Sequence, residues 1–349
     1  MLSLTVLGSG SSGNCAVVRT EKTRLLIDAG LSGRQIMLRL EAVGLRLEDL
    51  DGVLLTHEHC DHTAGLDILC RRHQVPLFAT PLTQEALMQG TFRKATPRWR
   101  LMQTGAPFDF QDLRIECFPV PHDAVDPVGF VIADEESRLG VLSDVGFVTN
   151  LIRDRLRGAH TLFVEANYDG PLLEADTKRP WATKQRISGR HGHLSNEQTA
   201  ELLQTLAHEG LHHVVLGHLS DDCNCPDVAL KKMTSVLRSS GALETKVVCA
   251  KRSVPLPWME VARRTCVVQT VLSPTTEPIP IPSPAASSIP VIIEEGASIP
   301  EEKNLSEPVV LYRTVPPVIP NAPTSPRIRK ANTTSQEVQS DFWLDPGVA

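Results

Sequence analysis

Four side chains that could bind a metal ion lie within the six-residue segment His57-Glu58-His59-Cys60-Asp61-His62. His57 and His59 are two apart on an extended stretch, so both imidazoles leave the backbone on the same side. Asp61 and His62 follow where the chain is expected to bend into a helix, which turns a second pair toward the same volume. Histidine nitrogens and carboxylate oxygens suit zinc, manganese or iron. The segment therefore predicts a metal site.

Three further donors each follow an apolar, strand-like run: His122, Asp144 and His218. Sites on sheets are commonly built where a buried strand reaches the surface, so we expect these residues to complete the metal site. One metal ion needs about four ligands, and a pair of ions needs more. The His/Asp set is large enough for two ions, so ligation by the neighbouring Cys60, Cys223 or Cys225 is not expected.

Short strands alternating with helices must position these donors. Turn residues and apolar runs predict strands over 2–7, 16–19, 24–27, 52–56, 114–118, 128–133, 139–142, 161–165, 213–216 and 246–249. Helices are expected over 32–43, 61–73, 147–156, 196–208 and 227–238, the first capped by Ser32. This alternation favours a layered α/β sandwich, although it does not determine the strand order.

The domain organisation follows from proline use in the 349-residue chain. Of 26 prolines, 14 lie after position 272, in a stretch without a core-forming pattern. We expect one folded domain over 1–266, which carries the metal site, and a disordered proline-rich tail over 267–349. The tail's end, Asp341-Phe342-Trp343-Leu344, could bind a protein partner, although an end without a partner is favoured.

The remaining composition excludes several classes of protein. No apolar run approaches the roughly 18 residues of a membrane span, and no secretory leader is evident, so a cytoplasmic protein with reduced cysteines is expected. The net charge of −6 does not by itself require a nucleic-acid partner.

A local basic run could nevertheless contact nucleic acid. It holds five cations in 13 residues with no acid between them: Lys178, Arg179, Lys184, Arg186 and Arg190. A solvated surface loop is the alternative interpretation. Trp181, inside the run, is expected to pack the loop against the domain, with stacking on a base as the alternative.

The order and spacing of the donors resemble those of the metallo-β-lactamase superfamily, over about residues 1–250. The resemblance implies a four-layer αββα sandwich with a dinuclear metal site along one edge. It also implies ligand roles. His57, His59 and His122 would hold the first metal ion, Asp61, His62 and His218 the second, and Asp144 would bridge them. Asp28, in Leu26-Ile27-Asp28-Ala29-Gly30, would support the metal-binding loop.

Narrower features resemble the YycJ/WalJ-like branch, whose members are described as metal-dependent 5′→3′ exonucleases acting on DNA. These features are the Gly8–Asn14 loop, the run Gly192-His193-Leu194-Ser195-Asn196, and His218-Leu219-Ser220 with Asn224 and Pro226. Tyr168 departs from the branch, where histidine is usual, and Cys223 replaces the first residue of a usual asparagine pair.

The mechanism expected from this resemblance is phosphodiester hydrolysis by a metal-bridged hydroxide. Asp61 would orient or deprotonate the water, and His193 would contact the phosphate or protonate the leaving oxygen. The expected substrate contacts are Ser11 and Asn14 in the glycine-rich loop and Lys184, Arg186 and Arg190 in the basic run. His193 could instead be structural, because it precedes Ser195, the expected N-cap of the following helix.

Several choices stay open at this point. The two divalent ions would be zinc or manganese, with iron as a further option. DNA is the expected substrate, but a hydrolase of a small phosphodiester, another ester or a thioester would use the same site. A metal- or DNA-binding module without turnover is the alternative from a different class. The oligomeric state is not indicated.

Overall fold

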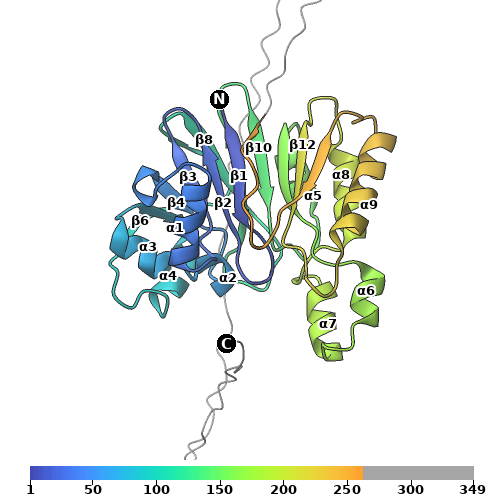
Figure 1. Ribbon diagram of the computed structural model, residues 1–349, viewed down its shortest axis with the longest axis horizontal. Coiled ribbons are helices and arrows are strands. Elements are labelled where there is room, and N and C mark those ends of the chain that lie inside the picture. Colours follow the sequence, from blue (N-terminus) through green and yellow to red (C-terminus); the bar gives the residue numbers. More distant parts are fainter. Residues whose placement is uncertain (262–349) are drawn as a thin grey trace, which may run out of the picture. The chain divides into compact units, whose positions relative to one another are not determined.

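A computed structural model of the chain describes residues 1–261 (Figure 1). The predicted tail over 267–349, with its possible partner segment, lies outside the described residues, as does the end of the predicted domain at 266. Along residues 1–261, no helix is long and apolar enough to cross a membrane.

The first sheet has seven strands and carries the N-terminal part of the chain. β1 pairs antiparallel with β2 and β14, β2 pairs antiparallel with β3, and the pairs from β3 to β6 are parallel. Across the sheet the order is β14 (Met259–Glu260), β1 (Ser3–Gly8), β2 (Cys15–Arg19), β3 (Arg24–Ile27), β4 (Gly52–Leu54), β5 (Pro76–Ala79) and β6 (Arg98–Leu101).

The second sheet also has seven strands. Its strands pair antiparallel from β7 to β10 and parallel from β10 to β13. The order is β13 (Lys246–Cys249), β12 (His213–Gly217), β11 (Thr161–Glu165), β10 (Arg138–Leu142), β9 (Val128–Ala133), β8 (Leu113–Pro119) and β7 (Phe108–Phe110).

Helices cover the outer face of each sheet (Figure 1). The first sheet is covered by α1 (Gly33–Ala42), α3 (Leu66–Arg72) and α4 (Pro81–Met88), with a short 3₁₀ turn over Leu47–Asp49. The second is covered by α5 (Asn150–Leu156), α8 (Asn196–Leu206) and α9 (Pro226–Ser239). Three short helices, α2 (Cys60–Thr63), α6 (Gly170–Ala175) and α7 (Trp181–Ser188), lie at one end of the sandwich.

Three apolar clusters hold these four layers together. One fills the space between the sheets and includes Leu4 and Ile27 from the first sheet and Phe130 from the second. The other two join each sheet to its helices, through residues such as Ile36 on α1 and Leu203 on α8. Most central strands are buried on both faces, which explains their unbroken apolar runs. The expected αββα sandwich is confirmed.

Several predicted boundaries are wrong for identifiable reasons. The helix expected over 61–73 is two helices, because Gly65 packs against backbone: a Cβ there would lie 2.5 Å from the Leu31 carbonyl oxygen. The helix expected from 147 begins at Asn150, where the Thr149 side chain accepts a hydrogen bond from Ile152 N–H. Strands β5, β6, β7 and β14 and helices α4, α6 and α7 were not predicted, since these elements are short or lack a clear apolar period.

Candidate metal centre

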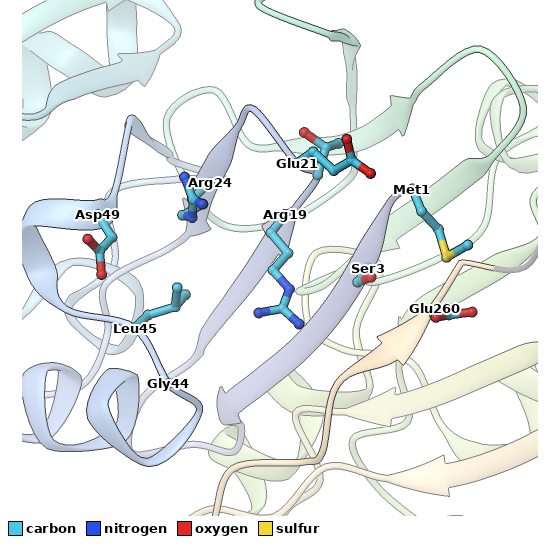
Figure 2. Close-up of a pocket in the computed structure, with 10 residues that line it drawn as sticks. Met1, Ser3, Arg19, Glu21, Arg24, Gly44, Leu45, Asp49 and Glu260 are labelled. Carbon is cyan, nitrogen blue, oxygen red and sulfur yellow. The ribbon is translucent and has the colours of Figure 1, made fainter.

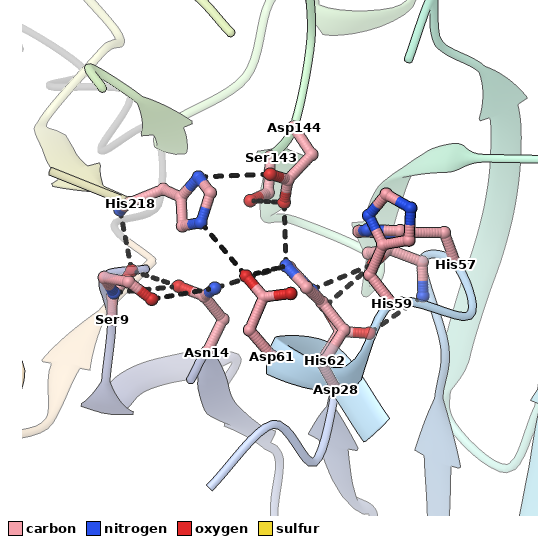
Figure 3. A network of polar contacts seen from close by, with 12 residues as sticks. Ser9, Asn14, Asp28, His57, His59, Asp61, His62, Ser143, Asp144 and His218 are labelled. Carbon is pink, nitrogen blue, oxygen red and sulfur yellow. Dashed lines mark hydrogen bonds and ion pairs between the residues drawn. The ribbon is translucent and has the colours of Figure 1, made fainter. Parts of the chain in front are cut away.

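The seven predicted donors come from loops that follow four different strands, and the structure brings all seven together. The 57–62 segment follows β4, His122 follows β8, Asp144 follows β10 and His218 follows β12. These strands belong to both sheets, so the cluster lies where the two halves of the sandwich meet. Figure 3 shows how His57, His59, Asp61, His62, Asp144 and His218 face one another.

The first group of donors consists of His57, His59 and His122, whose ligating atoms lie within 4.8 Å of one another. His122 donates its Nδ1–H to the Gly192 carbonyl oxygen at 3.0 Å, which leaves its Nε2 facing His59 Nδ1 at 3.3 Å. His57 Nε2 is buried without a hydrogen-bond partner. Three ring nitrogens thus converge on a common volume.

The second group consists of Asp61, His62 and His218. Asp61 Oδ2 lies 3.3 Å from His218 Nε2 and 3.6 Å from His62 Nε2. Asp144 lies against both groups: its Oδ2 is 2.8 Å from His62 Nε2, and it clusters with His57 and His62. A carboxylate between two sets of donors is placed where it could contact two ions.

Two independent observations indicate that the donor set fits a divalent cation. Ligands about 2.0–2.1 Å from a tetrahedral zinc ion lie about 3.3 Å from one another, close to the donor–donor distances quoted above. The lone pair of His57 Nε2 is buried and unpartnered, which costs free energy unless an ion or proton occupies it. The cluster is therefore suited to metal binding.

Asp28 holds the metal-binding loop in place from beneath (Figure 3). Its Oδ1 accepts the Thr56 N–H at 2.8 Å, and its Oδ2 accepts the Thr56 hydroxyl at 2.9 Å and the His62 Nδ1–H at 2.7 Å. The bond to Nδ1 fixes the His62 ring so that Nε2 points toward Asp144. Asp28 is buried, so the carboxylate is dedicated to this network.

Backbone strain is concentrated at the same place. Asp28, Asp144 and His218 all have φ between +53° and +56°, in the left-handed region that side-chain-bearing residues rarely adopt. Asp28 and His218 directly follow β3 and β12, and Asp144 lies two residues after the end of β10. Such conformations persist only where surrounding contacts enforce them, and they cluster at functional sites.

Glu165 is a site residue that the sequence analysis missed. Its fully buried Oε1 accepts Nδ1–H bonds from His193 at 2.7 Å and from His218 at 2.9 Å, while its Oε2 accepts the Val145 N–H at 2.9 Å. The available signal was an acidic residue ending the apolar strand β11, two residues before Asn167. Asn167 was missed too, and it donates to the His218 carbonyl oxygen at 2.9 Å.

The electrostatics of the cluster reflect this mixture of acids and imidazoles. Burial disfavours the charged form of His193, but Glu165 and Asp144 outweigh it and raise the His193 pKa to about 11. Burial likewise opposes ionisation of Asp144, yet His218 and His62 hold its pKa well below the usual range. The carboxylates thus stay ionised and the site favours positive charge.

The two tentative loop contacts lie in different environments. Asn14 is buried: its Oδ1 accepts from the Ser9 hydroxyl at 2.8 Å and from the Gly10 N–H at 3.0 Å, and its Nδ2 is 3.2 Å from His62 Nε2. This places Asn14 between the glycine-rich loop and the metal cluster (Figure 3). Ser11 is exposed at the tip of the loop. Their contact with a phosphate stays a prediction.

The basic run is only partly helical, because α7 contains Lys184 and Arg186 but not Lys178, Arg179 or Arg190, and most of its cations are paired. Arg186 Nε lies 2.6 Å from Asp123 Oδ2, directly beside His122, and Lys178 Nζ lies 2.5 Å from Asp222 Oδ1. Lys184 instead donates to the carbonyl oxygen of Glu174 at 2.8 Å, and no acidic side chain among residues 1–261 forms an ion pair with it. The Arg190 guanidinium lies over the Phe147 ring, 4.3 Å from its centroid.

The expectation that Trp181 packs this segment against the domain is wrong. Trp181 is 69% exposed. The small apolar cluster beneath the segment uses Tyr168, Leu173 and Ile187 instead, so the first residue of α7 is left facing solvent.

A separate cavity of about 510 Å³ lies at the opposite ends of the first strands (Figure 2). Ser3 at the start of β1 and Arg24 at the start of β3 line it, together with Arg19 at the end of β2. The metal cluster is at the other ends of these strands, beside Ser9 and Asp28. This cavity therefore has no part in the candidate metal centre.

Known proteins resemble the chain in both sequence and fold. Residues 23–219 match the family described as "Beta-lactamase superfamily domain". The exodeoxyribonuclease YycJ of Bacillus anthracis is 32% identical over 240 residues, covering 69% of this chain and 90% of that protein. The exodeoxyribonuclease WalJ of Streptococcus pneumoniae is 35% identical over 236 residues, covering 67% and 87%. The metallo-β-lactamase fold protein YhfI of Bacillus subtilis superposes with a TM-score of 0.55 at 18% identity, covering 73% and 98%.

Proposed function

Because the chain belongs to the metallo-β-lactamase superfamily of hydrolases, we propose that it is a metal-dependent phosphodiesterase, and specifically a 5′→3′ exonuclease acting on DNA. Two relatives, matched over 90% and 87% of their own length, are exodeoxyribonucleases, which supports DNA as the substrate. The observation that carries the proposal is the full His/Asp donor set that this chain gathers at one place. The residues that follow are assigned from the geometry of that set.

Two divalent cations would be held by the seven converging donors. His57, His59 and His122 would bind one, Asp61, His62 and His218 the other, and Asp144 would contact both. Zinc and manganese suit these donors best, and iron is a further option. When bound, such a pair of ions supplies a water nucleophile near neutral pH and positive charge for the phosphoryl oxygens.

The protein's own residues would orient water and move protons. The Asp61 side chain is partly exposed, at 22%, so its carboxylate can contact both the buried cluster and incoming water. We assign it the orientation of the attacking water. His193 is 19% exposed, and Glu165 fixes its Nδ1, which leaves Nε2 available to substrate. We assign His193 proton donation to the leaving 3′-oxygen.

Glu165 would act through His193 rather than on the substrate. Because its carboxylate is fully buried and accepts from both His193 and His218, it ties the proton donor to a metal ligand. An imidazole held by a buried carboxylate keeps one tautomer and one orientation, and its charged form is stabilised. This pairing supports a role for His193 in acid catalysis.

The decisive test is hydrolysis of 5′-phosphorylated, end-labelled DNA by the metal-loaded full chain. Nucleotides released one at a time from the 5′ end, with loss of activity in His59→Ala and Asp144→Ala, would support the proposal. Release of nucleotides from the 3′ end would overturn the proposed 5′→3′ direction of digestion. Turnover of a cyclic or aryl phosphodiester without turnover of DNA would favour the small-substrate hydrolase. Full metal content without any hydrolysis would favour the binding module.

A further inference from the structure

Helix α7 presents a continuous polar and aromatic face that the metal centre does not use. Trp181, Lys184, Gln185 and Ser188 are spaced i, i+3, i+4 and i+7, so they lie on one side of the helix. Together with Tyr168 and Leu173 they line a cavity of about 300 Å³ between α6 and α7. This volume is at the small end of the range typical of ligand-binding pockets.

The other side of α7 is joined to the metal centre at two points. Arg186 forms an ion pair with Asp123, the neighbour of His122. The Ile187 carbonyl oxygen accepts the His193 backbone N–H at 2.8 Å. The helix is therefore fixed against the site, and Figure 1 shows α6 and α7 at the end of the sandwich where α2 lies.

The length of α7 relates Trp181 to the candidate proton donor. Trp181 precedes Ile187, whose carbonyl oxygen accepts the His193 N–H, by six residues, which is about 9 Å along a helix axis. Consecutive stacked nucleotides lie about 3.4 Å apart along a strand, so this axial distance corresponds to about three nucleotides. A strand of at least this length whose phosphate reaches His193 could thus place a base near Trp181.

We propose that the Trp181 face of α7 is a subsite for an unpaired nucleobase of the substrate strand, an inference that rests on the proposed nuclease function. The exposed indole would stack on the base, since every base has a face that an aromatic ring can cover. Lys184, which donates to a carbonyl oxygen and has no ion-pair partner in the described part of the chain, would attract the adjoining phosphate. Glu174 also lines the cavity, so the phosphate must lie on the Lys184 side.

Binding of a short 5′-phosphorylated phosphorothioate DNA strand to the metal-loaded full chain tests the proposal without consuming the probe. Trp181→Ala should weaken binding about tenfold or more, whereas Trp181→Phe keeps an aromatic face and should stay within about threefold of the natural chain. Leu243→Ala is the matched control, because Leu243 is 65% exposed and lies outside the α6–α7 cavity. Strand binding should quench tryptophan fluorescence, and Trp181→Phe should remove most of that quenching.

Three results would overturn the subsite: a Trp181→Ala chain that binds as tightly as the natural one, equal weakening by Leu243→Ala, or no strand binding at all. A failure of the proposed nuclease function would give a different result from a failure of the subsite. The strand would still bind in a Trp181-dependent manner, but unmodified DNA would not be cut.

Discussion

The carboxylate of Glu165 lies 2.7 Å from Nδ1 of His193, and the same oxygen lies 2.9 Å from Nδ1 of His218. One buried acid thus positions both the candidate proton donor and a candidate metal ligand. It also accepts the backbone N–H of Val145, the residue after Asp144. The orientation of three site residues therefore depends on one side chain.

Replacing Glu165 with Gln should lower kcat on DNA by about 10- to 100-fold. A neutral amide stabilises the charged imidazole less than a carboxylate does, and its NH2 group cannot accept a hydrogen bond from either ring N–H. Binding of the strand should change little, since Glu165 does not contact solvent. Steady-state kinetics and a thermal melt together check this. An unchanged kcat in a chain with unchanged metal content would exclude the positioning role.

Replacing Asp28 with Asn should weaken metal binding by about 10- to 100-fold, since the His62 ring loses the acceptor that fixes its Nδ1–H. Competition with a chelator of known affinity measures this. Asp109→Asn is a suitable control, because Asp109 forms an exposed ion pair with Arg114 on the strand pair β7–β8. Equal metal affinity in Asp28→Asn and the natural chain would contradict the expectation.

Removing bound metal should lower the melting temperature, because an ion that binds only the folded chain stabilises it. The effect is about 2.7 kcal/mol when the free ion is at 100 times its dissociation constant. Thermal melts with chelator, and again after zinc or manganese is restored, measure the shift. His57→Ala should reduce the shift, since it removes the nitrogen that is buried without a partner. A melting temperature that does not change when all bound metal is removed would contradict the binding of a cation by this cluster.

A methyl group at Gly30 should disturb both stability and the site. A Cβ at Gly30 would lie 1.6 Å from the carbonyl oxygen of Asp61, so the backbone that carries Asp61 must move. We expect Gly30→Ala to cost about 1–3 kcal/mol of unfolding free energy or more and to weaken metal binding. Gly90→Ala is the control, because nothing lies within 4 Å of a Cβ there. Denaturant titration of both variants decides the point.

Two lysines of the basic run should differ in their effect on DNA binding. Lys184→Gln should reduce the salt dependence of binding by about 0.7–0.9 in the logarithmic slope, the contribution of one phosphate contact. Lys178→Gln should leave the slope nearly unchanged, because Lys178 is already paired with Asp222. Binding measured at several salt concentrations separates the two. Identical slopes in both variants would remove Lys184 from the strand-binding surface.

Much of the fold was predictable from the sequence because most central strands are buried on both faces and read as apolar runs. The seven donors were predictable for a related reason, as each follows a strand or lies in one dense motif. Glu165 was not predicted, because a single acid at a strand end has no pattern of its own. Helix α7 was missed because it buries none of its residues and so lacks an apolar period. The exposure of Trp181 could not be predicted from the sequence, because it depends on the tertiary arrangement.

The donors before position 63 follow strands of the first sheet, and those from 122 onward follow strands of the second. Neither half alone holds more than four of the seven, so the centre exists only after both halves have docked. A nascent chain that has not yet emerged past His218 lacks the last donor and cannot yet carry a complete centre. A complete centre therefore forms only after at least the first 218 residues have been made and both sheets have docked.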